Sequence, residues 1–168
     1  MIDDLVKALK LVPLPEEGGL YAETWRSGVT IPAADLPARY GGPRQAGTAI
    51  HFLLTAEPGC FSALHAVAGD EIFHFYLGDP VEMLLLHPDG RHETITLGPD
   101  ILGGQRVQFV VPAGSWQGCR LAPGGRFALM GTTMAPGFDV ADFTLGRRAD
   151  LCARYPEAVS LINSLTRD

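Results

Sequence analysis

The sequence predicts an all-β fold, a sandwich or closed barrel, with a short helix at each end. From Thr48 onward, short apolar or alternating segments are separated by clusters of Gly, Pro and Asp, which is typical of many short strands joined by turns. Pro88-Asp-Gly90, between two such segments, indicates a hairpin. The number and spacing of the segments fit a jelly roll. The predicted strands span residues 20–26, 48–54, 59–67, 71–77, 81–87, 92–97, 106–111, 117–121 and 127–134.

Both ends of the chain show the amphipathic period of a helix. Residues 1–12 place apolar side chains on one helical face, and Pro13 ends this predicted helix. Residues 149–165 show the same period, with Pro156 as a first-turn residue. Residues 28–47 are rich in Gly, Pro and Ala without a sustained period, so we predict a loop there.

Length and composition indicate one domain with a substantial core. The chain has 168 residues, of which 46% are hydrophobic, and a chain of this length can bury most of its apolar surface. We expect a single domain over residues 1–168, with the barrel covering residues 20–146. No apolar run approaches the roughly 18 residues of a membrane span, and the acidic N-terminal segment does not look like a signal peptide.

Charge and cysteine content narrow the classes of function. The net charge is -6 and Arg147-Arg148 is the only basic pair, so nucleic-acid binding is not expected. An acidic chain also disfavours polyanionic substrates unless a local arginine compensates. The three cysteines, Cys60, Cys119 and Cys152, are odd in number and lack metal-site spacing. They fit a reducing compartment, and we expect a cytoplasmic protein.

Two sequence blocks carry the strongest functional signal. The first contains Gly59, His65, Glu71 and Gly78, spaced by six, six and seven residues along an apolar stretch. The second block is Val110-Val-Pro-Ala-Gly-Ser-Trp-Gln117. Together they resemble the two blocks of the cupin superfamily, which are small β-barrels that hold a metal or a substrate inside.

This sequence departs from the superfamily pattern at two positions. The second histidine of the first block is replaced by Val67, and the final histidine of the second block is replaced by Gln117. The scaffold signal is therefore strong, whereas the signal for a metal site is weakened.

The chain also resembles one cupin subfamily, cupin 5 or domain of unknown function 985, from the first helix to about residue 146. The segments that carry this likeness are residues 17–27, 70–79, 108–117 and 134–139. The resemblance implies a double-stranded β-helix, the cupin jelly-roll barrel, with short N- and C-terminal helices. It also implies a homodimer like the sugar-nucleotide epimerases of the RmlC type. It implies no settled reaction, because the subfamily has none firmly established.

His65 and Glu71 are the candidate catalytic residues. In cupins, the strand faces that carry them point into the barrel, where a carboxylate needs a partner such as a metal, a protonated ring or an arginine. A structural His–Glu hydrogen bond across strands is one interpretation. The other is an acid–base pair, in which Glu71 holds the tautomer of His65 and raises its pKa for proton abstraction next to a carbonyl.

A metal site would have to use His65, Glu71 and Gln117. These residues supply one nitrogen and two oxygens, whereas transition metals in open sites prefer at least two histidines with a carboxylate. No cofactor is therefore firmly implied by the sequence, and a bound divalent metal remains an alternative.

Polar and aromatic side chains in the same segments are the candidate substrate-binding residues. An aromatic plane beside a guanidinium suits a sugar ring or a nucleotide base. Packing at a dimer interface explains the tryptophan and arginine of the N-terminal strand equally well. The candidates are Tyr21, Glu23, Trp25, Gln108, Trp116 and Gln117.

Two functional hypotheses follow, and the sequence does not separate them. The first is a sugar or sugar-nucleotide isomerase or epimerase that uses His65 and Glu71. The second is a non-catalytic protein that binds a small molecule. A metal-dependent cupin enzyme with a degenerate ligand set is a third. All three expect a sugar-like or other small-molecule ligand and a homodimer, without nucleic-acid or membrane partners.

Overall fold

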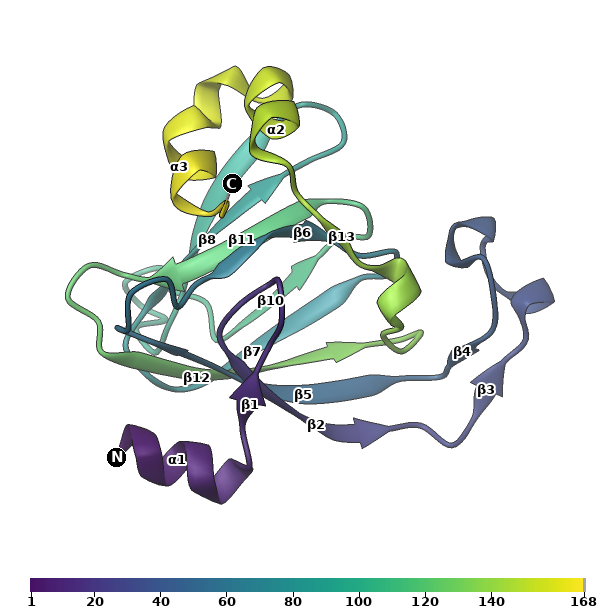
Figure 1. The fold of residues 1–168 in the computed structure, drawn as a ribbon, viewed down its shortest axis with the longest axis horizontal. Helices are drawn as coiled ribbons and strands as arrows, with labels where there is room; N and C mark the ends of the chain where they lie inside the picture. The colour runs from purple at the N-terminus through teal and green to yellow at the C-terminus, as the bar shows by residue number, and fades with distance from the viewer. Residues whose placement is uncertain (168) are drawn as a thin grey trace.

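Two antiparallel β-sheets pack face to face in the computed structural model, which describes residues 1–167 (Figure 1). The order of the six-stranded sheet is β1 (Val12–Pro13), β2 (Leu20–Arg26), β5 (Thr48–Thr55), β12 (Phe127–Met134), β7 (Glu71–Gly78), β10 (Gln108–Val111). The order of the five-stranded sheet is β13 (Thr144–Leu145), β6 (Ser62–Ala66), β11 (Trp116–Leu121), β8 (Val81–Leu86), β9 (His92–Leu97).

The observed strands confirm the predicted all-β jelly roll. Strands β2, β9 and β12 have the predicted bounds, and the other predicted strands differ from the observed ones by a few residues at their ends. The largest difference is at β6, which begins at Ser62 instead of Gly59. Gly59 has a φ of 77° and belongs to the turn that precedes the strand.

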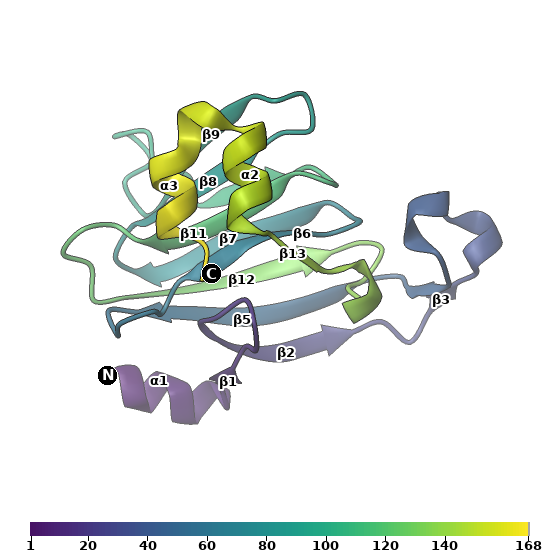
Figure 2. The same ribbon diagram turned by 45° about the horizontal axis from the view of Figure 1, so that its top comes forward.

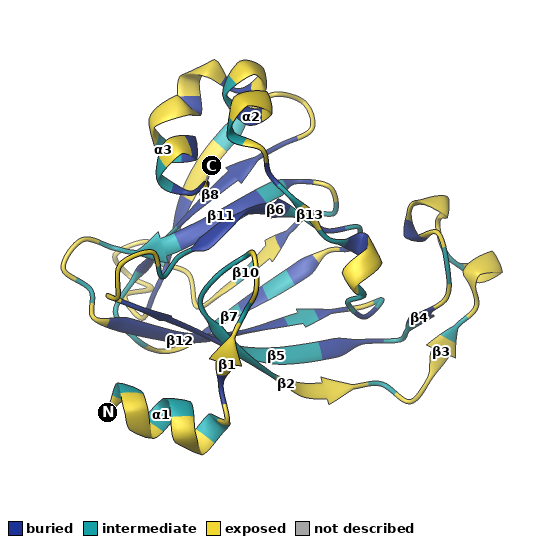
Figure 3. Cartoon of the chain, in the orientation of Figure 1, coloured by how far each residue is buried: buried dark blue, intermediate teal, exposed yellow. Residues whose placement is uncertain are grey.

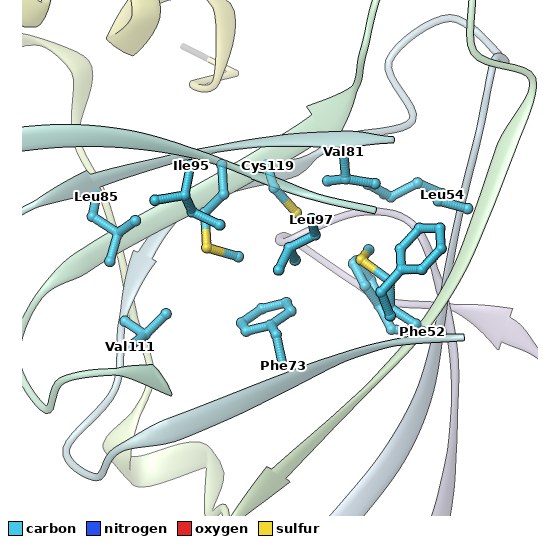
Figure 4. Packing of buried hydrophobic residues seen from close by; sticks show 13 residues of the cluster. Phe52, Leu54, Phe73, Val81, Leu85, Ile95, Leu97, Val111 and Cys119 are labelled. Carbon is cyan, nitrogen blue, oxygen red and sulfur yellow. The ribbon is translucent and has the colours of Figure 1, made fainter. Parts of the chain in front are cut away.

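The sandwich core lies between the two sheets, because alternate residues of each strand point inward. Figure 4 shows Phe52 and Phe73 from the six-stranded sheet facing Leu85 and Cys119 from the five-stranded sheet. Figure 3 shows that burial is concentrated in the strands, whereas the connecting turns are exposed.

The N-terminal helix packs on the outer face of the six-stranded sheet. Helix α1 (Ile2–Leu9) buries its apolar side against Leu53 and Leu129. It is shorter than the predicted helix over residues 1–12, because Lys10 adopts a left-handed conformation with φ 54° and ends it.

The C-terminal segment forms two helices where one helix over residues 149–165 was predicted, and Pro156 lies in the first turn of a helical element, as predicted. Helix α2 (Arg148–Arg154) and helix α3 (Val159–Ser164) are joined by the 3-10 turn η4 (Pro156–Ala158), and they cover the outer face of the five-stranded sheet (Figure 2). Pro156 lacks an N–H and keeps Tyr155 out of the helical conformation. The Tyr155 hydroxyl donates a hydrogen bond of 2.8 Å to the carbonyl of His87 and holds this bend against the sheet.

Residues 28–47 contain regular structure where the sequence predicts only a loop. They form a small sheet of β3 (Thr30–Ile31) and β4 (Arg44–Gln45) with two 3-10 turns, η1 (Ala33–Asp35) and η2 (Ala38–Tyr40). This arm projects beyond the sandwich at the right of Figure 1. A buried ion pair between Arg44 and Asp142 anchors it to the 3-10 turn η3 (Val140–Asp142). Across residues 1–167, no helix has the length and apolar character needed to span a membrane.

Candidate functional site

A cavity of about 190 Å³ lies between the sheets, lined mainly by β2, β5, β6, β7 and β12. Apolar and aromatic side chains make up half of the lining residues, and polar or charged side chains make up the other half. The ionisable side chains that line it are Glu17, Tyr21, Glu23, Arg26, His65 and Glu71.

His65 lies on β6 with only 3% of its surface exposed. Its Nδ1 is 2.8 Å from the carbonyl oxygen of Ala63. Because a carbonyl only accepts, Nδ1 must carry the hydrogen, and in the neutral ring Nε2 is then an acceptor. The ring stacks on Phe143, with centroids 5.3 Å apart and an interplanar angle of 25°. The backbone and Phe143 therefore fix both the tautomer and the orientation of His65.

Glu71 begins β7 and shares its inward face with Phe73 and Phe75, as the alternation predicts. Its exposed fraction is 8%, and Nε2 of Gln117 donates to its Oε2 at 2.5 Å. Burial raises the pKa of the Glu71 carboxyl. The opposing pull of His65 and the hydrogen bonds from Thr132 and Gln117 do not cancel this rise, and the nearby Glu17 adds to it. Glu71 consequently keeps its proton to a higher pH than an ordinary carboxyl group.

Gln117 lies on β11 directly opposite His65 in the strand register. Its side chain is 1% exposed, and within residues 1–167 its Oε1 has no hydrogen-bond partner. A buried carbonyl oxygen without a partner costs about 1–3 kcal/mol. Gln117 is not among the described residues that line the cavity, so its observed role is to donate to Glu71 from behind the cavity wall.

Glu17 is a site residue that the strand pattern did not identify. It lies in the turn between β1 and β2, where the two-residue alternation of a strand gives no information about side-chain direction. Ser62 Oγ donates to its Oε1 at 2.7 Å, and its Oε2 is 3.9 Å from Nε2 of His65. The only available signal was its place at the start of residues 17–27, one of the segments that carry the family likeness.

Of the predicted substrate-binding residues, Tyr21 and Glu23 line the cavity. Glu23 accepts two hydrogen bonds from Arg26, at 3.0 Å from Nε and 2.7 Å from Nη2. Nη1 of Arg26 donates to the carbonyl of Phe138 at 3.1 Å. The sequence suggested that the arginine of this strand would contact a ligand. In the structure, Arg26 is instead paired with Glu23 in the cavity wall.

Trp25, Gln108 and Trp116 do not line the cavity formed by the described part of the chain. The Trp25 ring packs over Gly47 and is half exposed. Gln108 is exposed, and its Nε2 is 3.2 Å from Nδ1 of His74. Trp116 packs against the cluster under the C-terminal helices, because its strand neighbour Gln117 takes the inward position.

The donor set does not fit a transition metal held by protein ligands. Across the described residues, no group of three or more His, Cys, Asp or Glu side chains is placed to hold an ion. Among residues 1–167, His65 supplies the single imidazole of the cavity lining, and the neighbouring inward position is Val67. The Glu71 carboxyl is directed to Gln117, and its raised pKa opposes the ionised form that a metal needs.

Solved structures with the same fold cover almost the entire chain. A hypothetical protein from Leishmania major is 30% identical, with a TM-score of 0.86 over 99% of this chain and 98% of that one. Protein SO0799 from Shewanella oneidensis is 34% identical, with a TM-score of 0.83 over 98% of this chain and 96% of that one. Neither description states an activity.

Sequence comparisons agree with the structural ones. The uncharacterized protein YML079W of Saccharomyces cerevisiae is 29% identical over 143 residues, which are 80% of this chain and 70% of the yeast protein. The profile of the Cupin_5 family, described as cupin superfamily (DUF985), matches residues 3–146. This chain therefore belongs to the DUF985 family of the cupin superfamily.

Proposed function

We propose that this cupin binds a single sugar-like molecule in its cavity and isomerises or epimerises it by proton transfer. The observation that carries the proposal is the surroundings of His65 Nε2. This acceptor atom belongs to a ring held in one tautomer, and Oε2 of Glu17 lies 3.9 Å from it. Glu71 lines the same cavity, and burial raises the pKa of its carboxyl, which suits this group to the role of a general acid.

His65 is the base in this proposal. Its Nε2 removes a proton from the carbon next to the substrate carbonyl, while Nδ1 stays bonded to the carbonyl of Ala63. The stacked Phe143 keeps the ring in place during the transfer.

Glu71 is the acid. Its raised pKa leaves the carboxyl protonated where an ordinary glutamate is ionised, so it can donate a proton to the carbonyl oxygen as the enediol forms. His65 then returns its proton to the former carbonyl carbon while the hydroxyl on the adjacent carbon gives a proton back to Glu71, which yields the isomer and restores both groups. The epimer forms when the enediol turns its other face toward His65 before the proton returns to the original carbon, and the enediol hydroxyl again restores the proton of Glu71. Neither outcome changes the oxidation state overall, and the reaction uses no co-reactant.

Cavity size and lining support a ligand with one ring. The volume of about 190 Å³ is close to the roughly 150 Å³ of an engineered apolar cavity that binds benzene. Tyr21, Phe138 and Phe143 supply aromatic surface for the apolar face of a sugar. A nucleoside diphosphate attached to that sugar would lie outside this volume.

The test is exchange of substrate protons with solvent. Wild-type protein in deuterium oxide is incubated with a panel of aldoses and ketoses, and incorporation at the carbon next to the carbonyl is followed by proton NMR. We expect His65→Gln to slow exchange by about 10²–10⁴-fold, the usual contribution of a general base. His92→Gln, on the edge strand β9, is the control and should exchange at the wild-type rate.

Two results would contradict the proposal. One is the absence of exchange into every sugar of the panel, including any that binds, which would favour the alternative of a non-catalytic binding protein. The other is exchange by His65→Gln at the rate of the His92→Gln control.

A further inference from the structure

The lining of the cavity is rich in acidic groups. Within residues 1–167 it contains three carboxyl groups, from Glu17, Glu23 and Glu71, and a single guanidinium, from Arg26. A concave site with apolar walls concentrates the field of such groups, so it attracts or rejects a ligand according to the charge of that ligand.

Within this lining, Glu17 is the carboxylate whose charge an incoming ligand meets, because the raised pKa of Glu71 favours its neutral form and Glu23 is paired with Arg26. Nε and Nη2 of Arg26 form a two-pronged contact with the Glu23 carboxylate, and Nη1 donates to the carbonyl of Phe138. The Nε–Nη2 edge is one of the two guanidinium edges that bind a phosphate or carboxylate in parallel, and Glu23 occupies it. An acidic ligand would therefore have to share Arg26 with a carboxylate of the protein itself.

The inner part of the cavity presents acceptor atoms. Ser62 donates to Oε1 of Glu17, whereas Oε2 is directed toward Nε2 of His65 at 3.9 Å. This distance is too long for a hydrogen bond, yet a ligand group placed between the two atoms can be within hydrogen-bonding distance of both. With His65 neutral, both atoms accept, so an amine can donate to both of them, whereas a hydroxyl can donate to one of them.

We infer that the cavity selects an uncharged or amine-bearing single-ring sugar and excludes its phosphorylated or carboxylated form. Glu17 is the residue that sets this choice. The inference rests on the binding part of the proposed function and not on proton transfer. A carboxylate or phosphate oxygen brought beside Glu17 Oε2 would face an acceptor of the same charge, and Arg26 of the lining is already paired with Glu23.

The experiment compares sugars that differ only in charge. Glucose, glucosamine, glucuronate and glucose 6-phosphate, and the corresponding members of the galactose and mannose series, are titrated into untagged protein by calorimetry at neutral pH and low salt. We expect at least one neutral or amine member to bind. Its acidic counterparts should bind at least tenfold more weakly.

Two variants assign the effect to Glu17. Glu17→Gln keeps the size of the side chain but removes its charge, so the advantage of the amine over the acidic member should fall at least tenfold. Glu16→Gln makes the same change of charge at the adjacent, exposed position outside the cavity lining. The charge preference of this control should equal that of the wild type.

Every outcome bears on the inference. Binding of an acidic sugar as tight as that of its neutral parent would overturn it, as would the lack of binding by all neutral and amine members. If Glu17→Gln and Glu16→Gln showed the same charge preference, Glu17 would not be the residue that sets it. Binding with the expected preference but without deuterium exchange would support charge selection and refute the isomerase. Exchange into a sugar phosphate would support the isomerase and refute charge selection.

Discussion

Replacing Glu71 by glutamine should stabilise the protein at neutral pH and have little effect in acid. Burial raises the pKa of Glu71 in the folded state, so the protonated carboxyl favours folding. This contribution is complete below the pKa of the unfolded chain, about 4.3, and is lost as the pH rises through the raised folded-state pKa. Above that range the wild type has to ionise a carboxyl that is 8% exposed, and the variant does not.

The size of the effect follows from linkage. Each unit by which the folded-state pKa exceeds the unfolded one costs the ionised protein about 1.4 kcal/mol. For a chain of this length, that corresponds to about 3–6 °C in Tm per unit. Glutamine keeps the shape of the side chain and an oxygen that can accept the hydrogen bond from Nε2 of Gln117. The substitution itself therefore lowers the free energy of unfolding very little.

The assay is thermal unfolding between pH 4 and pH 8. The Tm difference between Glu71→Gln and wild type should be near zero at the acid end and should grow with pH. Glu57→Gln, at an exposed position, controls for the change in net charge. A difference that is constant over the pH range, or one that follows the Glu57→Gln curve, would show that the reasoning about burial is incorrect.

Three further substitutions test the scaffold around the site by urea unfolding. Arg44→Met leaves Asp142 as a buried charge without its partner and should cost about 3–5 kcal/mol; a loss below about 1 kcal/mol would contradict this. Gly78→Ala should destabilise more than Gly90→Ala, because both glycines have positive φ but only at Gly78 would a Cβ lie 2.4 Å from a backbone oxygen; equal losses would count against crowding. Tyr155→Phe removes one hydrogen bond to a backbone carbonyl and should cost about 1 kcal/mol, with unchanged ligand binding.

The strands could be predicted because their signals are local. Alternation of inward and outward side chains, interrupted by Gly, Pro and Asp, identified β2, β9 and β12 with their observed bounds. The same alternation placed Glu71 on the buried face of β7 and His65 on the side of β6 that faces the cavity. The arm over residues 28–47 gave no such signal, because its strands are two residues long and it is anchored by a pair that joins Arg44 to Asp142.

The direct partners of the site residues could not be predicted. Sequence spacing suggested that His65 and Glu71 would act on each other, but His65 is oriented by the carbonyl of Ala63 and by Phe143. Glu71 instead bonds Gln117. Which side chains meet across two sheets depends on how the sheets are stacked and twisted, and spacing along one strand does not contain that information.

By itself, the sequence determined the fold class, the two inward-facing ionisable residues and the departure of Val67 and Gln117 from a histidine-rich pattern, since these depend on periodicity and residue identity. Tertiary structure alone decided that Glu17 joins the cavity, that Arg26 is already paired, and that Trp116 lies on the other side of its sheet. The physical reason is that charge and hydrogen bonding in a cavity are set by distances between segments far apart in the chain. Those distances exist only once the two sheets have packed.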